Sequence, residues 1–330
     1  MKLIFILITF LLFIGCGGSS GSSSSKDSNQ SEITDTNKTY QIQGKVVDGY
    51  ISGASVCIDE DNNGICTQND ITVQSDINGT FVFDAVELAN NTRYTILASG
   101  GTDTFINQIY DGVLQSVCKT DKSSKEIIIS PLSDLIVTAL KQSDSFELAQ
   151  QKIINLLHTN INQEDLEQNI VENTTLFIQA QAIEFLKVLL FEIISHYELS
   201  LEKAQIQEKI KQTIILSSSL YESDSIIENL ELQFSISLLD SHKLYLEQQL
   251  IKNKNLFDGL VNVDITSFGV QNLQVMLYED LSLMKINLQN SVYDTYTFKI
   301  IEKITSLLSI EINQVQNKSY NTPPALPKVR

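Results

Sequence analysis

The spacing of the hydrophobic positions changes twice along the chain. An apolar run covers residues 3–14 and is interrupted by Thr9 only. Between residues 40 and 118, short runs alternate apolar with polar side chains and are separated by turn pairs such as Asp48-Gly49 and Asn78-Gly79. From residue 131 onward the apolar side chains recur every three or four positions. These patterns predict a leader, a strand-rich part and a helical part.

The alternating part predicts several short strands. Val, Ile, Thr, Tyr and Phe favour strands, and Gly, Asn and Asp favour the turns between them. Regular short strands of this kind are typical of a small antiparallel β-sandwich, which we place at residues 41–125. The predicted strands cover residues 41–47, 54–58, 71–73, 80–83 and 94–97.

The helical part begins at Ser130-Pro131, with Ser as N-cap and Pro in the first turn. Two further pairs have capping-box spacing, Asp144 with Glu147 and Ser225 with Glu228. The apolar spacing predicts about five to seven helices in an all-α bundle over residues 126–316. The predicted segments include residues 176–197, 201–217, 225–252 and 270–313. The fold class is therefore α+β and multidomain, and the Pro-rich residues 317–330 are expected to form a disordered tail.

The apolar leader is too short to span a bilayer. Residues 3–14 would extend about 18 Å as a helix, against about 30 Å of hydrocarbon, so residues 1–15 match a signal peptide. Phe13-Ile14-Gly15-Cys16 resembles the lipobox of bacterial lipoproteins, although Phe is uncommon at its first position. This resemblance implies a lipid anchor on Cys16. An ordinary secretory signal followed by an accidental cysteine is the alternative.

Residues 16–40 are rich in Ser, Gly, Asp, Asn and Thr, and predict a flexible tether behind the lipid. In the lipoprotein family, Asp after the lipidated cysteine retains some proteins in the inner membrane. Gly17 stands there in this chain, which favours an outer-membrane location facing either the periplasm or the cell surface.

Charge excludes one class of partner. The chain carries a formal net charge of −17, and removal of residues 1–15 with Lys2 gives −17 − 1 = −18. So acidic a protein has no basic patch for nucleic acid or for anionic lipid headgroups. The expected partners are the membrane, through the lipid anchor, and another envelope or surface protein.

Four motifs together resemble the carboxypeptidase-regulatory-like, transthyretin-like domain family. The resemblance covers about a quarter of the chain and implies a non-catalytic β-sandwich module rather than peptidase activity. The motifs are Val47-Asp48-Gly49-Tyr50-Ile51-Ser52-Gly53-Ala54, Val56-Cys57-Ile58-Asp59, Asp61-Asn62-Asn63-Gly64-Ile65-Cys66 and Ser75-Asp76-Ile77-Asn78-Gly79-Thr80-Phe81.

One loop also resembles the calcium loop of EF-hands and dockerins. Asp59, Asp61 and Asn63 occupy its first, third and fifth positions, Gly64 the sixth, and Asp70 the twelfth, where Glu is usual. Carboxylate and amide oxygens at this spacing can converge on one Ca²⁺. The flanks predict strands instead of helices, so a polar hairpin turn is the alternative.

Cys57 and Cys66 flank this loop, and an exported chain favours a disulfide between them. Cys118 could instead pair with one of the two, or remain a buried thiol. Zinc is not expected, because no histidine lies near the cysteines in the sequence. His158, His196 and His242 are expected to be isolated side chains scattered among the helices.

No catalytic motif is present, so we expect a non-enzymatic envelope lipoprotein that acts as a surface interaction or adhesion module. The alternative is a periplasm-facing ligand-binding or assembly factor of the envelope. A third hypothesis, an unrecognised hydrolase, predicts a deep polar cleft with converging carboxylates.

Overall fold

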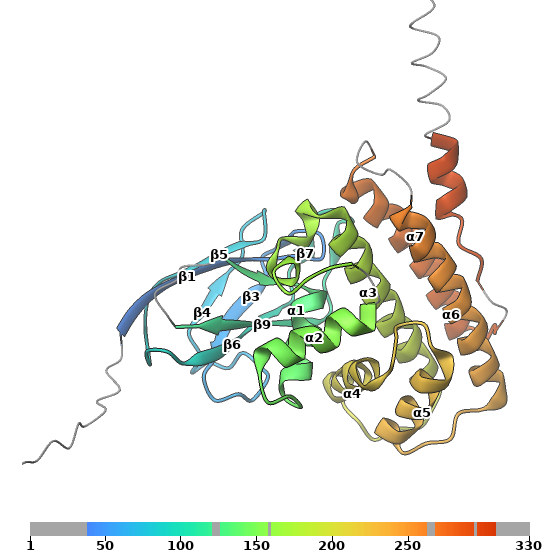
Figure 1. Cartoon of the computed structure of the whole chain (residues 1–330), viewed down its shortest axis with the longest axis horizontal. Helices are drawn as coiled ribbons and strands as arrows, with labels where there is room; N and C mark the ends of the chain where they lie inside the picture. The colour runs from blue at the N-terminus through green and yellow to red at the C-terminus, as the bar shows by residue number, and fades with distance from the viewer. Residues whose placement is uncertain (1–37, 121–125, 158–159, 263–267, 294–295, 308–330) are drawn as a thin grey trace, which may run out of the picture. The chain divides into compact units, whose positions relative to one another are not determined.

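A computed structural model describes residues 38–120, 126–157, 160–262, 268–293 and 296–307 (Figure 1). Within these ranges the chain is mixed α+β, and all of the strands precede the helices. The predicted signal peptide, the lipidation site Cys16, nearly all of the predicted tether, His158 and the Pro-rich tail lie outside the described residues.

The strands form three sheets, and each of the five strands predicted from alternation corresponds to an observed one. The first sheet has the order β10-β1-β5, from β10 (Ile127–Ile129), β1 (Lys38–Val46) and β5 (Thr80–Leu88). The second has the order β4-β3-β6-β9, from β4 (Thr72–Gln74), β3 (Ser55–Asp59), β6 (Arg93–Ser99) and β9 (Val113–Lys119). The third has the order β2-β7-β8, from β2 (Ile51–Ser52), β7 (Thr102–Asp103) and β8 (Gln108–Ile109).

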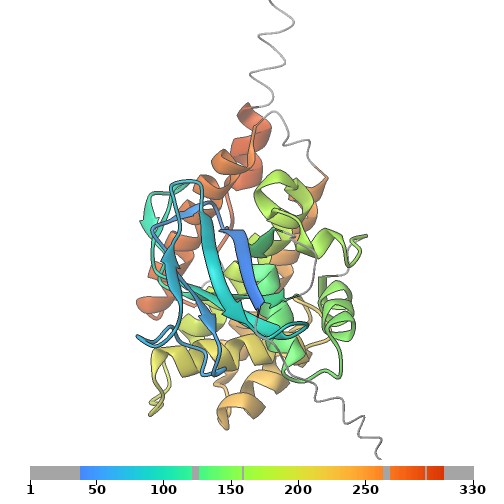
Figure 2. The ribbon, with the colours of Figure 1, turned by 90° about the vertical axis from the view of Figure 1, so that its left-hand side faces the viewer.

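The two larger sheets share one apolar cluster, which explains the alternation in the sequence. Ile42 and Val46 of β1 and Phe83 of β5 are buried against Val56 of β3 and Ile96 of β6. Because side chains along a strand point to opposite faces, every second residue enters this cluster. Figure 2 shows the strands from their own side of the molecule.

The last strand differs from the prediction, because it pairs in parallel with β1. Gly44 of β1 allows this pairing: a Cβ there would lie 2.1 Å from the carbonyl oxygen of Ile127 and 2.6 Å from the ring of Phe81. The strands are therefore not antiparallel throughout. In addition, β10 falls within residues 126–316, where sequence analysis places the helical domain.

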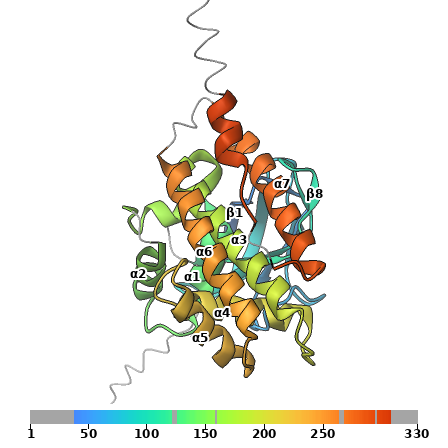
Figure 3. The same cartoon turned by 90° about the vertical axis from the view of Figure 1, so that its right-hand side faces the viewer.

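The helices surround one long, almost wholly buried helix. α3 (Thr174–Ile194) contacts α1 (Pro131–Leu140), α4 (Lys203–Leu216), α6 (Asp240–Val261) and α7 (Val270–Gln289). Figure 3 shows α3 between α6 and α7. The remaining helices of the described part are α2 (Phe146–Leu157), α5 (Ser223–Phe234) and residues 300–307. None of the helices of the described part combines the length and apolar composition needed to cross a membrane.

The start of α1 is as predicted. The Ser130 hydroxyl accepts a hydrogen bond from the Ser133 amide at 3.2 Å, and the Ser133 hydroxyl accepts one from the Ser130 amide at 2.8 Å. The helical apolar cluster also contains Val47 and Ile128 from the strand-rich part. All described residues therefore belong to one compact unit.

The other two predicted capping boxes are wrong. α2 begins at Phe146, and Ser145 rather than Asp144 accepts the hydrogen bond from the Leu148 amide, at 3.2 Å. α5 begins two residues before Ser225, whose hydroxyl accepts from the Ser218 amide at 3.1 Å.

The predicted helix over residues 225–252 is two helices. Ser235 has a φ of 53°, the left-handed conformation that ends many helices, and it closes α5. α6 then begins at Asp240. Serine at a left-handed position carries no clear sequence signal, because glycine or asparagine is usual there.

Candidate functional site

A cavity of about 800 Å³ is lined by α3, α4, α7 and the loops of the strand-rich part. Its wall carries an unusual number of buried polar side chains, contributed by segments that lie far apart in the sequence. They form a carboxylate-rich end, a network of buried ion pairs and a distal ion pair, described in turn below.

Asp48 lies at the carboxylate-rich end of the cavity and is only 9% exposed. Its Oδ1 accepts a hydrogen bond of 2.7 Å from Nε2 of Gln181 in α3. Burial raises the pKa of Asp48 well above its usual range, and the carboxylates of Glu184 and Asp103 raise it further, while Lys187 opposes them. Ionisation of Asp48 is therefore less favourable than that of an exposed aspartate.

Asp103, in the short strand β7, connects three segments at the same end. Its carboxylate accepts hydrogen bonds from the Gly49 amide at 3.0 Å, the Phe105 amide at 2.8 Å and Nε2 of Gln274 at 2.7 Å. Burial raises the pKa of Asp103, and these hydrogen bonds act in the opposite direction. Asp103 thereby fixes the position of α7 relative to the strands.

Gln274 presents a buried oxygen without a hydrogen-bond donor. The residue is 2% exposed, its Nε2 donates to Asp103, and its Oε1 has no hydrogen-bond partner among the described residues. Exchanging the two amide atoms would place oxygen against the Asp103 carboxylate, so the orientation is fixed. A Cβ on Gly49 would lie 2.8 Å from this Oε1 and 2.4 Å from Oδ1 of Asp103.

The ion-pair network lies beside this end. Nζ of Lys211 is 2.9 Å from Oδ1 of the fully buried Asp134 and 3.0 Å from Glu208. Nζ of Lys187 is 2.8 Å from Glu184 and 3.7 Å from Oδ2 of Asp134. Burial lowers the pKa of Lys211, but the carboxylates of Asp134 and Glu208 outweigh it and raise the pKa above its usual value. Both lysines therefore remain charged at neutral pH.

The distal end is closed by Glu192 of α3, whose Oε1 lies 3.3 Å from Nζ of Lys285 in α7. Between the two ends the lining includes apolar side chains as well as the ion-paired Glu184 and Lys187. Phe185 and Val188 contribute from α3, and Tyr278 and Leu281 from α7.

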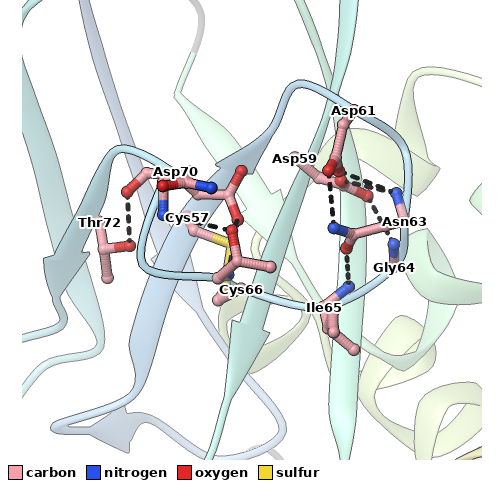
Figure 4. Close-up of a disulfide and its surroundings, with 11 residues drawn as sticks. Cys57, Asp59, Asp61, Asn63, Gly64, Ile65, Cys66, Asp70 and Thr72 are labelled. Carbon is pink, nitrogen blue, oxygen red and sulfur yellow. Dashed lines mark hydrogen bonds between the residues drawn. A yellow bond between two sulfur atoms is a disulfide. The ribbon is translucent and has the colours of Figure 1, made fainter.

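The predicted calcium loop brings three of its four predicted ligands together (Figure 4). The Asp59 carboxylate accepts hydrogen bonds of 3.0 Å from the Asn63 and Gly64 amides, and Asp61 accepts one of 2.8 Å from Nδ2 of Asn63. Asp70 lies apart from them and accepts bonds of 2.6 Å and 2.7 Å from the amide and hydroxyl of Thr67. In the described ranges no group of three His, Cys, Asp or Glu side chains is arranged to hold a metal ion.

The predicted disulfide is confirmed. Cys57 and Cys66 are joined, with a Cα–Cα distance of 5.7 Å. Cys118 is a buried thiol in β9 and is not bridged to either of them.

Two of the three histidines are not isolated, so that prediction is wrong. The ring centroids of His196 and His242 are 5.6 Å apart, and Tyr197 and Tyr293 pack against the pair. His242 is 2% exposed. The end of α3 meets the start of α6 here, and spacing along the sequence gave no sign of that contact.

Sequence analysis missed the cavity residues. Asp48 entered only as part of a turn and of the first carboxypeptidase-regulatory-like motif. The available signal was a polar side chain within an apolar stripe, as at Asp134 in α1, Gln181 in α3 and Lys211 in α4. Such positions are usually apolar, so a buried charge there indicates a partner or a ligand.

No protein-family model, curated protein or solved structure is significantly similar to this chain. The resemblance to the carboxypeptidase-regulatory-like family therefore stays a prediction, and the argument for function depends on the cavity.

Proposed function

We propose that this chain is a non-enzymatic envelope lipoprotein, anchored by a lipid on Cys16, that binds a small molecule in the cavity lined by α3, α4 and α7. One observation carries the proposal. A cavity of about 800 Å³ combines buried polar groups with apolar side chains such as Phe185, Val188 and Leu281 on its wall. Binding sites for small ligands typically enclose about 300–1,000 Å³ and combine these two features.

The free-energy cost of burying these polar groups supports a ligand-binding function. Removing a carboxylate from water costs several kcal/mol unless hydrogen bonds or an opposite charge compensate for it. A spacer or adhesion module needs no such groups inside it. Asp48, Asp103 and Gln274 therefore favour the ligand-binding alternative over the adhesion module.

The proposal also includes the arrangement of the strand-rich part and of the helices. We assign residues 41–125 to a carboxypeptidase-regulatory-like β-sandwich and the later helices to a bundle. The sandwich is a non-catalytic support whose loops form one wall of the cavity. Ca²⁺ bound by Asp59, Asp61 and Asn63 stabilises the exposed loop beside the disulfide.

Blocking the cavity tests the binding function. The mature protein is screened by calorimetry against cationic, anionic, sugar-like and neutral apolar small molecules. Val188→Trp places an indole among the lining residues, whereas Leu283→Trp adds the same group on the exposed face of α7. We expect at least one class to bind the wild type and Leu283→Trp but not Val188→Trp. Absence of binding by every class, or equal binding by both variants, would refute the proposal.

Lipid anchoring is tested separately by replacing the cysteine. We expect Cys16→Ser to move the protein from the envelope fraction to the soluble fraction, because the acyl chains are the only proposed anchor. Ser19→Ala, three residues further along, is the control and should leave the distribution unchanged. If Cys16→Ser still sediments with the envelope, the anchor is refuted.

A hydrolase is the second candidate, because Asp48, Asp103, Asp134 and Glu184 line one cavity, as that hypothesis requires. A buried carboxyl group with a raised pKa can act as a general acid. Against this role, Asp134 and Glu184 are held in ion pairs and Asp103 accepts hydrogen bonds from three groups. Turnover of chromogenic glycosides or esters that is lost in Asp48→Asn would favour the hydrolase.

A further inference from the structure

The carboxylates that line the cavity are not all paired with lysines. Among the described residues that line it, five carboxylates lie within ion-pair distance of a lysine, whereas Asp48 and Asp103 do not. The paired carboxylates are Asp111, Asp134, Glu184, Glu192 and Glu208. Asp48 and Asp103, at one end of the cavity, are therefore the acidic groups of this wall that lack a cation at ion-pair distance.

A second, independent observation at this end is Oε1 of Gln274, which accepts no hydrogen bond from the described residues. Oε1 is buried and has no donor, and a Cβ on Gly49 would lie 2.8 Å from it and 2.4 Å from Oδ1 of Asp103. An unsatisfied buried acceptor destabilises the folded protein, so a hydrogen-bond donor supplied by a ligand would offset that cost. Asp48, Asp103 and Gln274 Oε1 are all acceptors, which favours a cationic N–H donor and disfavours an anion.

The length of the cavity can be estimated from the two helices α3 and α7 that line it. Gln181, beside Asp48, and Glu192 are eleven residues apart on α3, as are Gln274 and Lys285 on α7. The hydrogen bond network joins α3 and α7 at the first end, and Glu192–Lys285 joins them at the other. At about 1.5 Å per residue the two ends are about 16 Å apart. Phe185 and Val188 of α3 and Leu281 of α7 line the cavity between these ends, beside the ion-paired Glu184 and Lys187.

We propose that the ligand is an elongated amphiphilic amine, with its ammonium group against Asp48, Asp103 and Gln274 and its apolar chain along α3 and α7 toward Glu192. This inference rests on the proposed binding function and names the ligand class for the same site. The ammonium supplies both the missing positive charge and the missing donor. Phe185, Val188 and Leu281 supply the apolar contact for the chain.

Three probes of equal chain length test the head group on the wild-type protein. Dodecylamine, dodecan-1-ol and dodecanoate are titrated by calorimetry below the concentrations at which they aggregate. A charge-assisted hydrogen bond is stronger than a neutral one, so we expect the amine to bind at least about tenfold more tightly than the alcohol. Dodecanoate should bind more weakly than either. This comparison needs no variant.

A charge-neutral variant locates the ammonium group. Asp48→Asn keeps the shape of the side chain and should lower the affinity for dodecylamine about tenfold, while the affinity for dodecan-1-ol stays the same. The control is Asp258→Asn, which removes the same charge from α6 outside the cavity, where Asp258 is 56% exposed and paired with Lys254. We expect that variant to bind the amine as the wild type does.

Two outcomes overturn the inference: the alcohol binds as tightly as the amine, or Asp48→Asn leaves the affinity for the amine unchanged. In either case, binding that Val188→Trp abolishes still supports the proposed function, so the two failures are distinguishable. If none of the three probes binds, the amine class is wrong, and the wider screen alone decides whether the cavity binds a ligand.

Discussion

Tyr197 and His242 form a hydrogen bond of 2.8 Å between the phenol oxygen and Nδ1 of the imidazole. The same hydroxyl accepts a hydrogen bond of 2.9 Å from the Leu239 amide. A neutral His242 can accept the hydroxyl proton at Nδ1 while the phenol oxygen accepts from the Leu239 amide. This contact joins the residues that follow α3 to the start of α6.

Acid should therefore weaken the packing of α3 against α6. Burial lowers the pKa of His242, and the facing His196 ring lowers it further. The unfolded chain, with a histidine pKa of about 6.5, binds more protons than the folded protein just below that pH. The contribution of His242 to stability is present above pH 6.5 and is lost as the pH falls through about 6.5 toward the lower, folded pKa.

The difference between two melting curves isolates this contribution. Melting temperatures of the wild type and His242→Gln are measured between about pH 8 and pH 5, across the histidine range. The wild type should lose more stability than the variant over this interval. Other groups titrate in both proteins and cancel in the difference. Parallel curves would mean that His242 does not control this contact.

Removing one partner of the buried ion pair should be strongly destabilising. Lys211→Met leaves Asp134 fully buried next to Lys187 alone, at 3.7 Å. Breaking a buried pair in this way costs about 3–5 kcal/mol. Lys203→Met is the matched control, since Lys203 pairs with the exposed Asp111, and a surface pair contributes at most about 1 kcal/mol. Urea unfolding measures both, and equal losses would contradict the assignment.

The disulfide should stabilise the loop and the strands beside it. Cys57 and Cys66 are nine residues apart, and closing a loop of this length contributes about 2–3 kcal/mol in the chain-entropy description. Cys66→Ser should lower the free energy of unfolding by this amount, and a reducing agent should do the same to the wild type. The reducing agent should have no further effect on Cys66→Ser. A further loss there would point to another disulfide.

The strands and the cavity differ in how far the sequence predicts them. Alternation located β1, β3, β4, β5 and β6, because each buries one face, but it missed β9, and the Ser130 cap follows from local hydrogen bonding. The cavity depends on pairs that no local pattern connects: Gln181 with Asp48 is 133 residues apart, and Gln274 with Asp103 is 171. The prediction of helix ends failed where a helix is closed by a residue type that is uncommon at that position, such as the left-handed Ser235.

Calcium binding should depend on Asp61 but not on Asp70. Asp59, Asp61 and Asn63 lie together, whereas Asp70 is engaged by Thr67 on another part of the loop. A ligand that binds only the folded protein raises its stability in proportion to the logarithm of one plus its concentration over Kd. At about 1 mM Ca²⁺, the range of extracellular calcium modules, the wild-type melting temperature should therefore rise.

Two neutralised variants separate the roles of these carboxylates. Asp61→Asn should abolish the rise caused by Ca²⁺, because it removes a charged ligand. Asp70→Asn should keep the rise but lower the melting temperature without Ca²⁺, because it weakens the hydrogen bonds to Thr67 that also hold the pKa of Asp70 below its usual value. If Ca²⁺ gives neither heat nor a higher melting temperature in the wild type, the loop is a polar hairpin turn held by its own hydrogen bonds.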